Sequence, residues 1–281
     1  MDIGIGLPAT IPGVEGKQLT DWAKKADEAG FSTLATIDRI VYPNCEPFIA
    51  LAAAAAVTER IRLTTAIAIL PYRESATLVA KQAATIHSLS GGRFVLGAAV
   101  GGREDDYEAA GSNFHDRGKR FAAMLEEIER IWQGEGGIGP ELDNPPPILI
   151  GGSADVAYER AARFGAGWIM GGGTPEMLSE GREKTKAAWK EGGRDGEPRV
   201  AGLAYFALGD GAEDAAQSYL KDYYAWLGEY TDQVASSAAT DEDTVKGYIQ
   251  GFDEAGCDEL IFFPCSTDPG QVDLLAEVAL S

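Results

Sequence analysis

Histidine and cysteine are scarce in this chain of 281 residues. Only His87 and His115 are present, which argues against a histidine-rich metal site. The cysteines, Cys45, Cys257 and Cys265, are odd in number and widely separated, and this pattern disfavours disulfide bonds. We therefore expect no metal centre and no disulfide framework.

Basic residues and long apolar runs are also in short supply. The chain has 24 Lys+Arg against 44 Asp+Glu, a formal net charge of -20, whereas nucleic-acid surfaces need clustered Lys and Arg. The longest run of small apolar residues, 49–57, is far shorter than the roughly 20 residues that cross a bilayer. The first residues, 1–4, lack the basic and apolar regions of a signal peptide. We expect a cytoplasmic globular protein with no nucleic-acid or membrane partner.

Short β-branched runs alternate with longer helical patterns along the whole chain. The runs predict strands at 3–7, 33–37, 61–70, 94–100, 148–150, 168–170, 201–207 and 260–263. Helices are predicted at 18–29, 47–60, 75–89, 119–132, 155–164, 175–190 and 269–280, with two more inside 212–251.

Eight strands that are each followed by a helix predict an α/β fold, a (β/α)8 TIM barrel with inserted loops at its C-terminal face. We expect one domain over residues 1–281, because the loop at 134–147 leads directly into the next strand. The rival is a doubly wound sheet. Gly4, Gly6 and Ala9 superficially fit its G-x-G-x-x-A turn, but these glycines lie inside the first strand and Pro8 follows it.

Glycine clusters follow three of the predicted strands, at the barrel end where function collects. Gly151, Gly152 and Ser153 precede a helix, so they are either an anion site or simply a tight capped turn. Gly101 and Gly102 leave the same two alternatives, although the adjacent Arg103 offers a bidentate phosphate contact. The cluster at 171–173 is interpreted as a flexible loop near the pocket.

Charged residues at the strand ends give few catalytic candidates. Asp38 and Arg39 are interpreted from sequence alone as a structural ion pair. In the acidic run Glu104, Asp105 and Asp106, we single out Glu104 because it is nearest the strand end; such runs are usually solvated. No Ser-His-Asp order, nucleophile elbow or metal spacing is present. This lack suggests that a bound organic cofactor performs the difficult chemistry.

Several segments together resemble the bacterial luciferase-like oxidoreductases. They are 60–66, 70–73, 80–93, 108–111, 117–120 and 147–153, in the family's order. The resemblance implies a barrel that binds FMN or the 5-deazaflavin coenzyme F420, with the cofactor ring over the third strand. It also implies a bulge with a non-prolyl cis peptide, which we place at Ala66 and Ile67. Gly101, Gly102, Arg103, Gly151, Gly152 and Ser153 are then the candidates for the cofactor's phosphate side.

The sequence departs from many relatives at the end of the second strand. Those relatives have an acidic residue followed by a catalytic histidine, and here the pair is Asp38 and Arg39. Arginine stays protonated and cannot act as a general base, so Arg39 is predicted to stabilise a reduced ring or orient an acidic substrate. Glu104 is the candidate acid or base.

The resulting hypothesis is an oxidoreductase that uses reduced F420 or FMN for hydride transfer to, or oxygenation of, a small organic substrate. A homodimer is usual in the family, and oxygenation would need a separate flavin or deazaflavin reductase. One alternative is a non-catalytic flavin-binding protein. Another is a phosphate-binding barrel lyase or isomerase, which would normally offer a Schiff-base lysine at a strand end, and none is found there.

Overall fold

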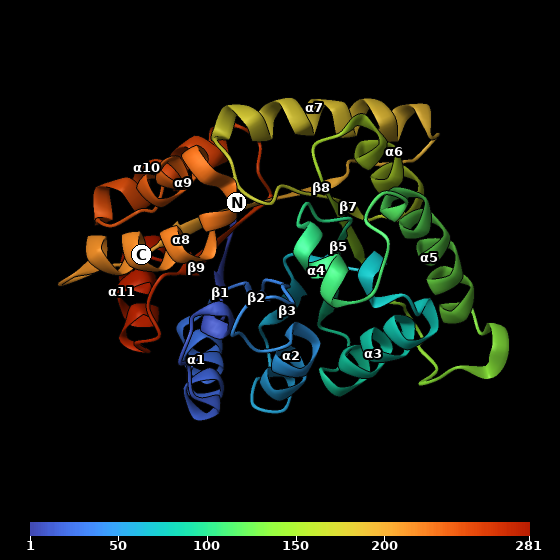
Figure 1. The fold of residues 1–281 in the computed structure, drawn as a ribbon, viewed down its shortest axis with the longest axis horizontal. Helices are drawn as coiled ribbons and strands as arrows, with labels where there is room; N and C mark the ends of the chain where they lie inside the picture. The colour runs from blue at the N-terminus through green and yellow to red at the C-terminus, as the bar shows by residue number, and fades with distance from the viewer.

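Parallel strands close on themselves to form a barrel in the computed structural model, which describes residues 1–281 (Figure 1). The strand order is β3-β2-β1-β9-β8-β7-β6-β5-β4, and β3 also pairs with β5, which closes the ring. The strands are β1 (Asp2–Gly6), β2 (Thr33–Thr36), β3 (Arg62–Thr65), β4 (Ala68–Ile69), β5 (Phe94–Ala99), β6 (Ile148–Gly151), β7 (Gly167–Ile169), β8 (Arg199–Phe206) and β9 (Glu259–Pro264). The predicted (β/α)8 barrel is confirmed.

The third predicted strand, at 61–70, is interrupted. It forms β3 and β4. Because β3 pairs with the first residues of β5 and β4 with its last residues, the two short strands together occupy one of the eight strand positions of the barrel. Ala66 and Ile67 lie at the interruption, and the peptide bond between them is cis, as expected. The predicted bulge is therefore present at this pair of residues.

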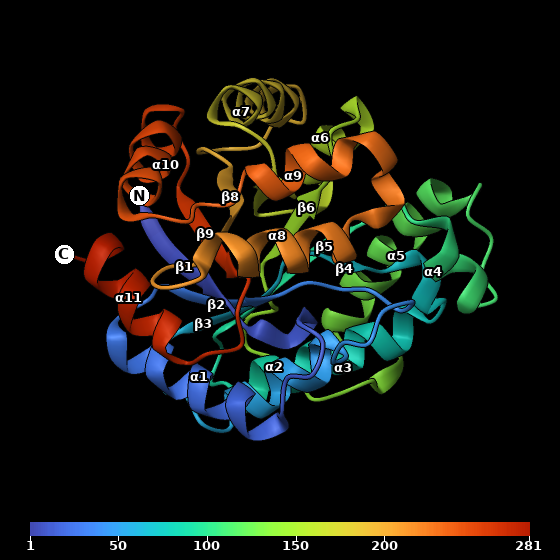
Figure 2. The ribbon, with the colours of Figure 1, turned by 60° about the vertical axis from the view of Figure 1, so that its left-hand side comes forward.

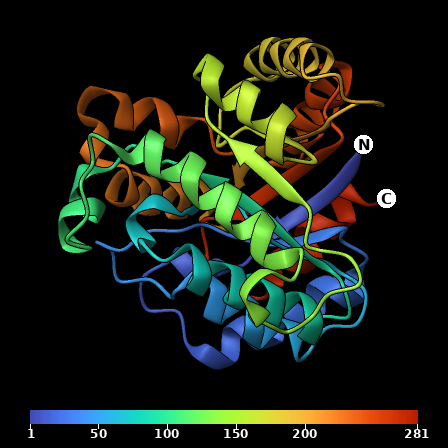
Figure 3. The same ribbon diagram turned by 90° about the vertical axis from the view of Figure 1, so that its right-hand side faces the viewer.

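Helices surround the barrel on its outer side (Figures 1 and 2). Figure 3 shows α5 running beside α6 and α3, with which it packs. The helices are α1 (Gly16–Ala29), α2 (Pro47–Ala55), α3 (Ala76–Leu89), α4 (Glu104–Ala109), α5 (Arg117–Trp132), α6 (Asp155–Phe164), α7 (Pro175–Glu191), α8 (Ala212–Tyr223), α9 (Thr231–Ser236), α10 (Glu242–Glu254) and α11 (Gly270–Ala279), with short 3-10 turns η1 (Pro8–Thr10), η2 (Pro71–Arg73), η3 (Glu135–Gly137) and η4 (Ala225–Tyr230). None of them is long and apolar enough to cross a membrane.

Two predicted helical segments differ from the structure. The helix predicted at 47–60 ends at Ala55, because residues 56–61 turn and Asp27 accepts hydrogen bonds from the N–H groups of Glu59 and Ile61. The segment 212–251, predicted to hold two helices, contains α8, η4, α9 and most of α10. α8 ends at Tyr223, and Gly228, with a positive φ of 59°, breaks the helical path again inside η4.

Successive side chains of a strand point to opposite faces, so the apolar residues of the strands are divided between two cores. The larger core joins the outward strand faces to the helices and includes Trp22, Phe94, Phe121 and Trp168. A smaller cluster contains the opposite set of strand side chains, which fill the barrel: Ala35, Ala66, Leu149, Ile169, Ala201, Leu203, Ile261 and Phe263.

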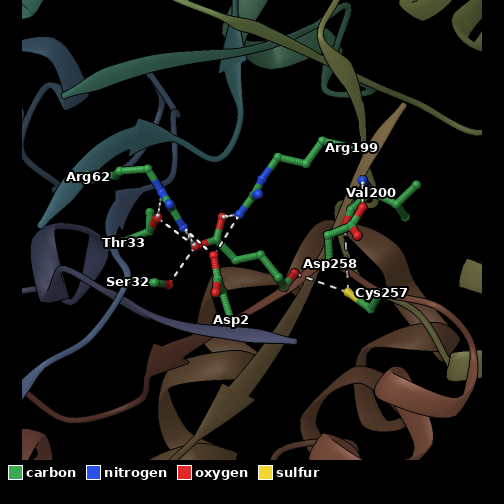
Figure 4. Close-up of polar contacts among 9 residues, drawn as sticks. Asp2, Ser32, Thr33, Arg62, Arg199, Val200, Cys257 and Asp258 are labelled. Carbon is green, nitrogen blue, oxygen red and sulfur yellow. Dashed lines mark hydrogen bonds and ion pairs between the residues drawn. The ribbon is translucent and has the colours of Figure 1, made fainter. Parts of the chain in front are cut away.

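A network of charges lies at the amino ends of the strands. Glu259, at the start of β9, is 3 % exposed, and its carboxylate lies 2.8 Å from Arg62 and 3.1 Å from Arg199. Figure 4 shows Arg62 and Arg199 pointing toward one another, with Asp2 between them. Ser32 and Thr33 each donate a hydrogen bond of 2.6 Å to the same carboxylate. Active sites of such barrels lie at the carboxyl ends of the strands, which is the end opposite to this network. We therefore interpret the network as stabilising the fold.

Candidate functional site

A cavity of about 560 Å³ opens at the carboxyl ends of the strands. Its lower wall comes from the barrel itself, with Ala66, Ile67 and Ile69 at the β3–β4 interruption and Leu203 and Phe263 from β8 and β9. Its outer wall comes from the segment between β8 and β9. A cavity of this size and apolar character is typical of a site for a small organic molecule.

The floor of the cavity is shaped by a glycine behind it. A Cβ atom built on Gly151 would lie 2.6 Å from Cδ1 of Ile67 and 3.3 Å from Cβ of Ala99. Gly151 is buried at the end of β6 and does not itself line the cavity. It therefore determines the floor indirectly, by leaving room for the Ile67 side chain.

Aromatic side chains form much of the outer wall. Tyr223 is the last residue of α8 and Tyr224 follows it. Trp226 and Tyr230 lie in η4, and Tyr205 projects from β8. The hydroxyls of Tyr205 and Tyr224 are 2.8 Å apart and form a hydrogen bond with each other. Burial raises the pKa of both phenols, so they remain protonated.

Arg103 connects the loop after β5 to this aromatic wall. Its guanidinium lies 4.8 Å from the ring centroid of Tyr223 and 4.6 Å from that of Trp226, within cation–π range. Its Nη2 donates a hydrogen bond of 3.3 Å to the Tyr223 carbonyl, whereas Nη1 is buried and has no partner. Arg103 is the only basic side chain in the cavity lining.

Asp106 also lines the cavity, from the first turn of α4. Its side chain is held by the second-strand loop, because Oδ1 accepts hydrogen bonds from the N–H groups of Ile40 at 2.9 Å and Val41 at 2.7 Å. Burial raises the pKa of this carboxyl above its ordinary value, although these two N–H groups act in the opposite direction. Asp106 is thus a buried, oriented carboxylate at the cavity wall.

Asp38 and Arg39 do not form the predicted ion pair. Asp38 binds Arg73 of η2, which lies 2.9 Å from both carboxylate oxygens, and it also accepts a hydrogen bond from the Ile69 N–H. Arg39 turns away toward α8 and α4, where it donates to the Tyr223 carbonyl at 2.9 Å and lies 3.7 Å from Asp105. The interpretation of Asp38 and Arg39 as a pair is wrong, because neighbouring residues in this loop point in different directions.

The structure brings only some of the predicted site residues together. Five line the cavity: Ala66, Ile67, Gly101, Gly102 and Arg103. Five lie outside its lining: Arg39, Glu104, Gly151, Gly152 and Ser153. Glu104 is exposed to solvent on the outer side of α4. The glycine cluster at 171–173, predicted only as a loop near the pocket, lines the cavity together with Thr174 and Pro175 at the start of α7.

Two groups of lining residues were missed by sequence reasoning. Asp106 was grouped with its neighbours as a solvated run, although a helix beginning at Glu104 turns the third acidic residue inward. Sequence reasoning gives no role to Tyr223 and Tyr224, although Tyr219 and Tyr223 are four residues apart and so place two aromatic rings on one face of α8. That spacing was the available signal.

Comparison with known proteins identifies the family. The luciferase-like monooxygenase family matches residues 1–254. This chain belongs to it. Among curated relatives, the uncharacterized protein Rv0940c of Mycobacterium tuberculosis is 33% identical over 207 residues, which cover 61% of this chain and 71% of that protein.

Solved structures of other proteins share the fold at low sequence identity. An F420-dependent secondary alcohol dehydrogenase, in complex with an F420-acetone adduct, has a TM-score of 0.85 at 16% identity. The match covers 99% of this chain and 98% of that chain. The monooxygenase RslO1 from Streptomyces bottropensis has a TM-score of 0.78 at 21% identity, with 100% of this chain and 99% of that chain covered.

Proposed function

We propose that this protein is an oxidoreductase that holds reduced F420 or FMN in the cavity and acts on a small organic substrate. The observation that carries the proposal is the apolar cavity directly above the Ala66–Ile67 interruption, where the family resemblance places the cofactor ring. Membership of the luciferase-like family supports the same chemistry, since neighbours of this fold include an F420-dependent dehydrogenase and a monooxygenase.

The cavity residues fit such a cofactor. Ala66 and Ile67 offer an apolar floor for a planar ring, and Gly101 has a positive φ of 67° that keeps its loop close to the cavity. Arg103, whose Nη1 is buried without a partner, supplies a positive charge beside that loop. Gly101, Gly102 and Arg103 are therefore the proposed phosphate side, and the roles predicted for Gly152 and Ser153 stay predictions.

When bound, the reduced ring would supply a hydride, or two electrons for the activation of oxygen. The protein's own contribution is to position the reactants and to exclude water, which the apolar floor and aromatic wall are suited to do. Oxygenation would require a separate reductase as a partner. No lysine lines the cavity, so the structure gives no support to a Schiff-base lyase.

The test is a fluorescence titration with FMN and with F420, each oxidised and reduced. We expect one cofactor to bind wild-type protein, and Ile67→Trp to weaken that binding at least about tenfold by filling the floor. The matched control is Ile49→Trp, because Ile49 lies on α2 at 70 % exposure and is not part of the cavity lining. Binding of neither cofactor to the wild type would contradict the proposal.

Selective binding also separates the two reaction types. Selective binding of F420 would favour hydride transfer, and selective binding of reduced FMN would favour a two-component monooxygenase. Tight binding with no turnover of any oxidant or substrate would favour the non-catalytic flavin-binding alternative.

A further inference from the structure

Asp106 presents one free carboxylate oxygen to the cavity. Oδ1 is occupied by the N–H groups of Ile40 and Val41, whereas Oδ2 forms no hydrogen bond within the protein. Oδ2 is also not among the side-chain atoms that are sealed from solvent without a partner, and Asp106 lines the cavity. A carboxylate with one anchored oxygen and one open oxygen is a fixed hydrogen-bond acceptor.

The other two charged side chains of the lining are already engaged. Both oxygens of Asp38 accept hydrogen bonds from Arg73, so this carboxylate is neutralised. Arg103 is held against the rings of Tyr223 and Trp226, and the proposed function assigns its unpartnered Nη1 to the phosphate side of the cofactor. Among the charged groups, Asp106 is therefore the one that offers an accessible, unoccupied atom.

Several aromatic side chains line the same cavity as Asp106. The hydroxyl of Tyr107, beside Asp106, donates to the Val100 carbonyl at 2.6 Å, and the hydroxyls of Tyr205 and Tyr224 bind each other. These side chains use their hydroxyls within the protein and offer rings to the cavity. A ligand with an apolar body and a hydrogen-bond donor directed at Asp106 would therefore suit this part of the lining.

We propose that Asp106 Oδ2 anchors a hydroxyl or amino group on an otherwise apolar or aromatic substrate. The inference rests on the proposed function for the identity of the ligand as substrate, and it assigns to Asp106 the specificity-determining contact. It differs from the sequence prediction, which placed the important carboxylate at Glu104, two residues earlier and outside the cavity lining.

The same helical turn provides matched controls. Glu104, Asp105 and Asp106 all lie in the first turn of α4, but only Asp106 lines the cavity. Asp105 is oriented toward Arg39, at 3.7 Å. The variants Asp106→Asn and Asp105→Asn therefore remove the same charge from the same turn, one inside the site and one outside. Asn at 106 keeps an oxygen that can accept from Ile40 and Val41.

The experiment measures binding of benzylamine, benzyl alcohol, toluene and benzoate by calorimetry. We expect benzylamine and benzyl alcohol to bind at least about tenfold more tightly than toluene and benzoate, since a donor gains a hydrogen bond to a charged acceptor. Asp106→Asn should abolish most of the preference for benzylamine and leave toluene binding unchanged. Asp105→Asn should keep the wild-type order.

Two results with the variants would overturn the inference. One is an unchanged preference in Asp106→Asn. The other is tightest binding of benzoate that is lost in Arg103→Met, which would assign the polar end of the cavity to an acidic ligand. A second comparison uses wild-type protein only and so does not depend on the folding of a variant. Benzyltrimethylammonium has the charge of benzylamine without an N–H donor, and equal affinity for the two would also count against a hydrogen bond to Asp106.

The cofactor titration on the same proteins separates this inference from the proposed function. If wild-type protein shows the Asp106-dependent preference but binds neither FMN nor F420, the oxidoreductase proposal fails and the assignment of Asp106 stands. If a cofactor binds and the preference is absent, the proposed function stands and the assignment of Asp106 fails.

Discussion

Asp38 and Arg73 form a buried ion pair in which Nη2 of the arginine lies 2.9 Å from each carboxylate oxygen. The pair ties the end of β2 to the turn after β4, on either side of the cavity rim. Arg73 also donates to Glu46 at 2.8 Å, at the start of α2. Asp38, the acidic residue at the end of the second strand, is therefore bound to Arg73, which follows the interrupted third strand.

Removal of Arg73 should destabilise the fold strongly. The Asp38 side chain is 2 % exposed, so Arg73→Met leaves a buried carboxylate without its counter-charge, at an expected cost of about 3–5 kcal/mol in the free energy of unfolding. Urea unfolding measures this cost. The control is Arg130→Met, because Arg130 and Glu135 are both more than half exposed, and a loss below about 1 kcal/mol is expected there.

Arg39→His should lower stability rather than restore a catalytic base. Arg39 is a link between the second-strand loop and α8, and histidine is too short to keep both its hydrogen bond to the Tyr223 carbonyl and its contact with the Tyr42 ring at 4.7 Å. We expect a loss of about 2 kcal/mol by thermal unfolding. Asp105→Asn, which removes only the 3.7 Å ion pair, should cost far less. Unchanged stability in Arg39→His would refute this structural role.

Stability should fall in acid, and Glu259 should cause part of the fall. Burial alone would raise the pKa of Glu259, but the charge of Arg62 and the hydroxyls of Ser32 and Thr33 outweigh it, so the pKa lies below its ordinary value of 4.5. A carboxyl with a lowered folded-state pKa stabilises the fold above 4.5, and this contribution is lost as pH falls through 4.5 toward the folded-state value.

Urea unfolding between pH 6 and pH 3 tests this dependence. We expect Glu259→Gln to cost about 3 kcal/mol at pH 6 and to show a shallower decline than wild type toward pH 3. Parallel pH profiles for the two proteins would mean that Glu259 titrates normally in the fold.

Two glycine-to-alanine substitutions should have different consequences. In Gly97→Ala the new Cβ would lie 1.9 Å from the carbonyl oxygen of Thr65, so backbone must move where β5 meets the third strand position. We expect this variant to lose more than about 3 kcal/mol of stability or to remain unfolded. Far-ultraviolet circular dichroism with thermal unfolding provides the measurement.

In Gly151→Ala the new Cβ would instead meet the flexible tip of Ile67, at 2.6 Å. The side chain can move into the cavity, so we expect a smaller stability loss of about 1 kcal/mol and weaker binding of whichever cofactor the wild type takes. Cofactor titration and thermal unfolding on one preparation measure both effects. A normal cofactor affinity would show that Ile67 does not contact the bound ring.

Local pattern was sufficient to predict most of the fold. Alternating β-branched runs and capped helices predicted all eight barrel positions, and the family resemblance located the interruption at Ala66 and Ile67. The helices within 212–251 were harder to predict. The positive φ of Gly228 interrupts them, and the residues on either side of this glycine are compatible with a helix.

The candidate site was predicted less well, since side-chain direction in loops depends on tertiary contacts. Asp38 and Arg39 are adjacent in sequence, yet one binds Arg73 and the other binds the α8 carboxyl end. Similarly, the choice between Glu104 and Asp106 depends on the direction of α4, which the N–H groups of Ile40 and Val41 help to fix. Neither direction can be derived from spacing alone.

Apart from Tyr205 of β8, the aromatic wall belongs to one continuous insertion between β8 and β9, so most of it lies outside the barrel strands. β8 and β9 pair with each other along their length, from Ala201 with Glu259 to Phe206 with Pro264, independently of the residues that connect them. The insertion supplies Tyr223, Trp226 and Tyr230 to the cavity but no strand to the barrel. Side chains at 223, 226 and 230 can therefore be changed to alter the preferred substrate without touching a strand, provided that the Tyr223 carbonyl keeps its hydrogen bond from Arg39 and that Phe252 of α10 stays in the core.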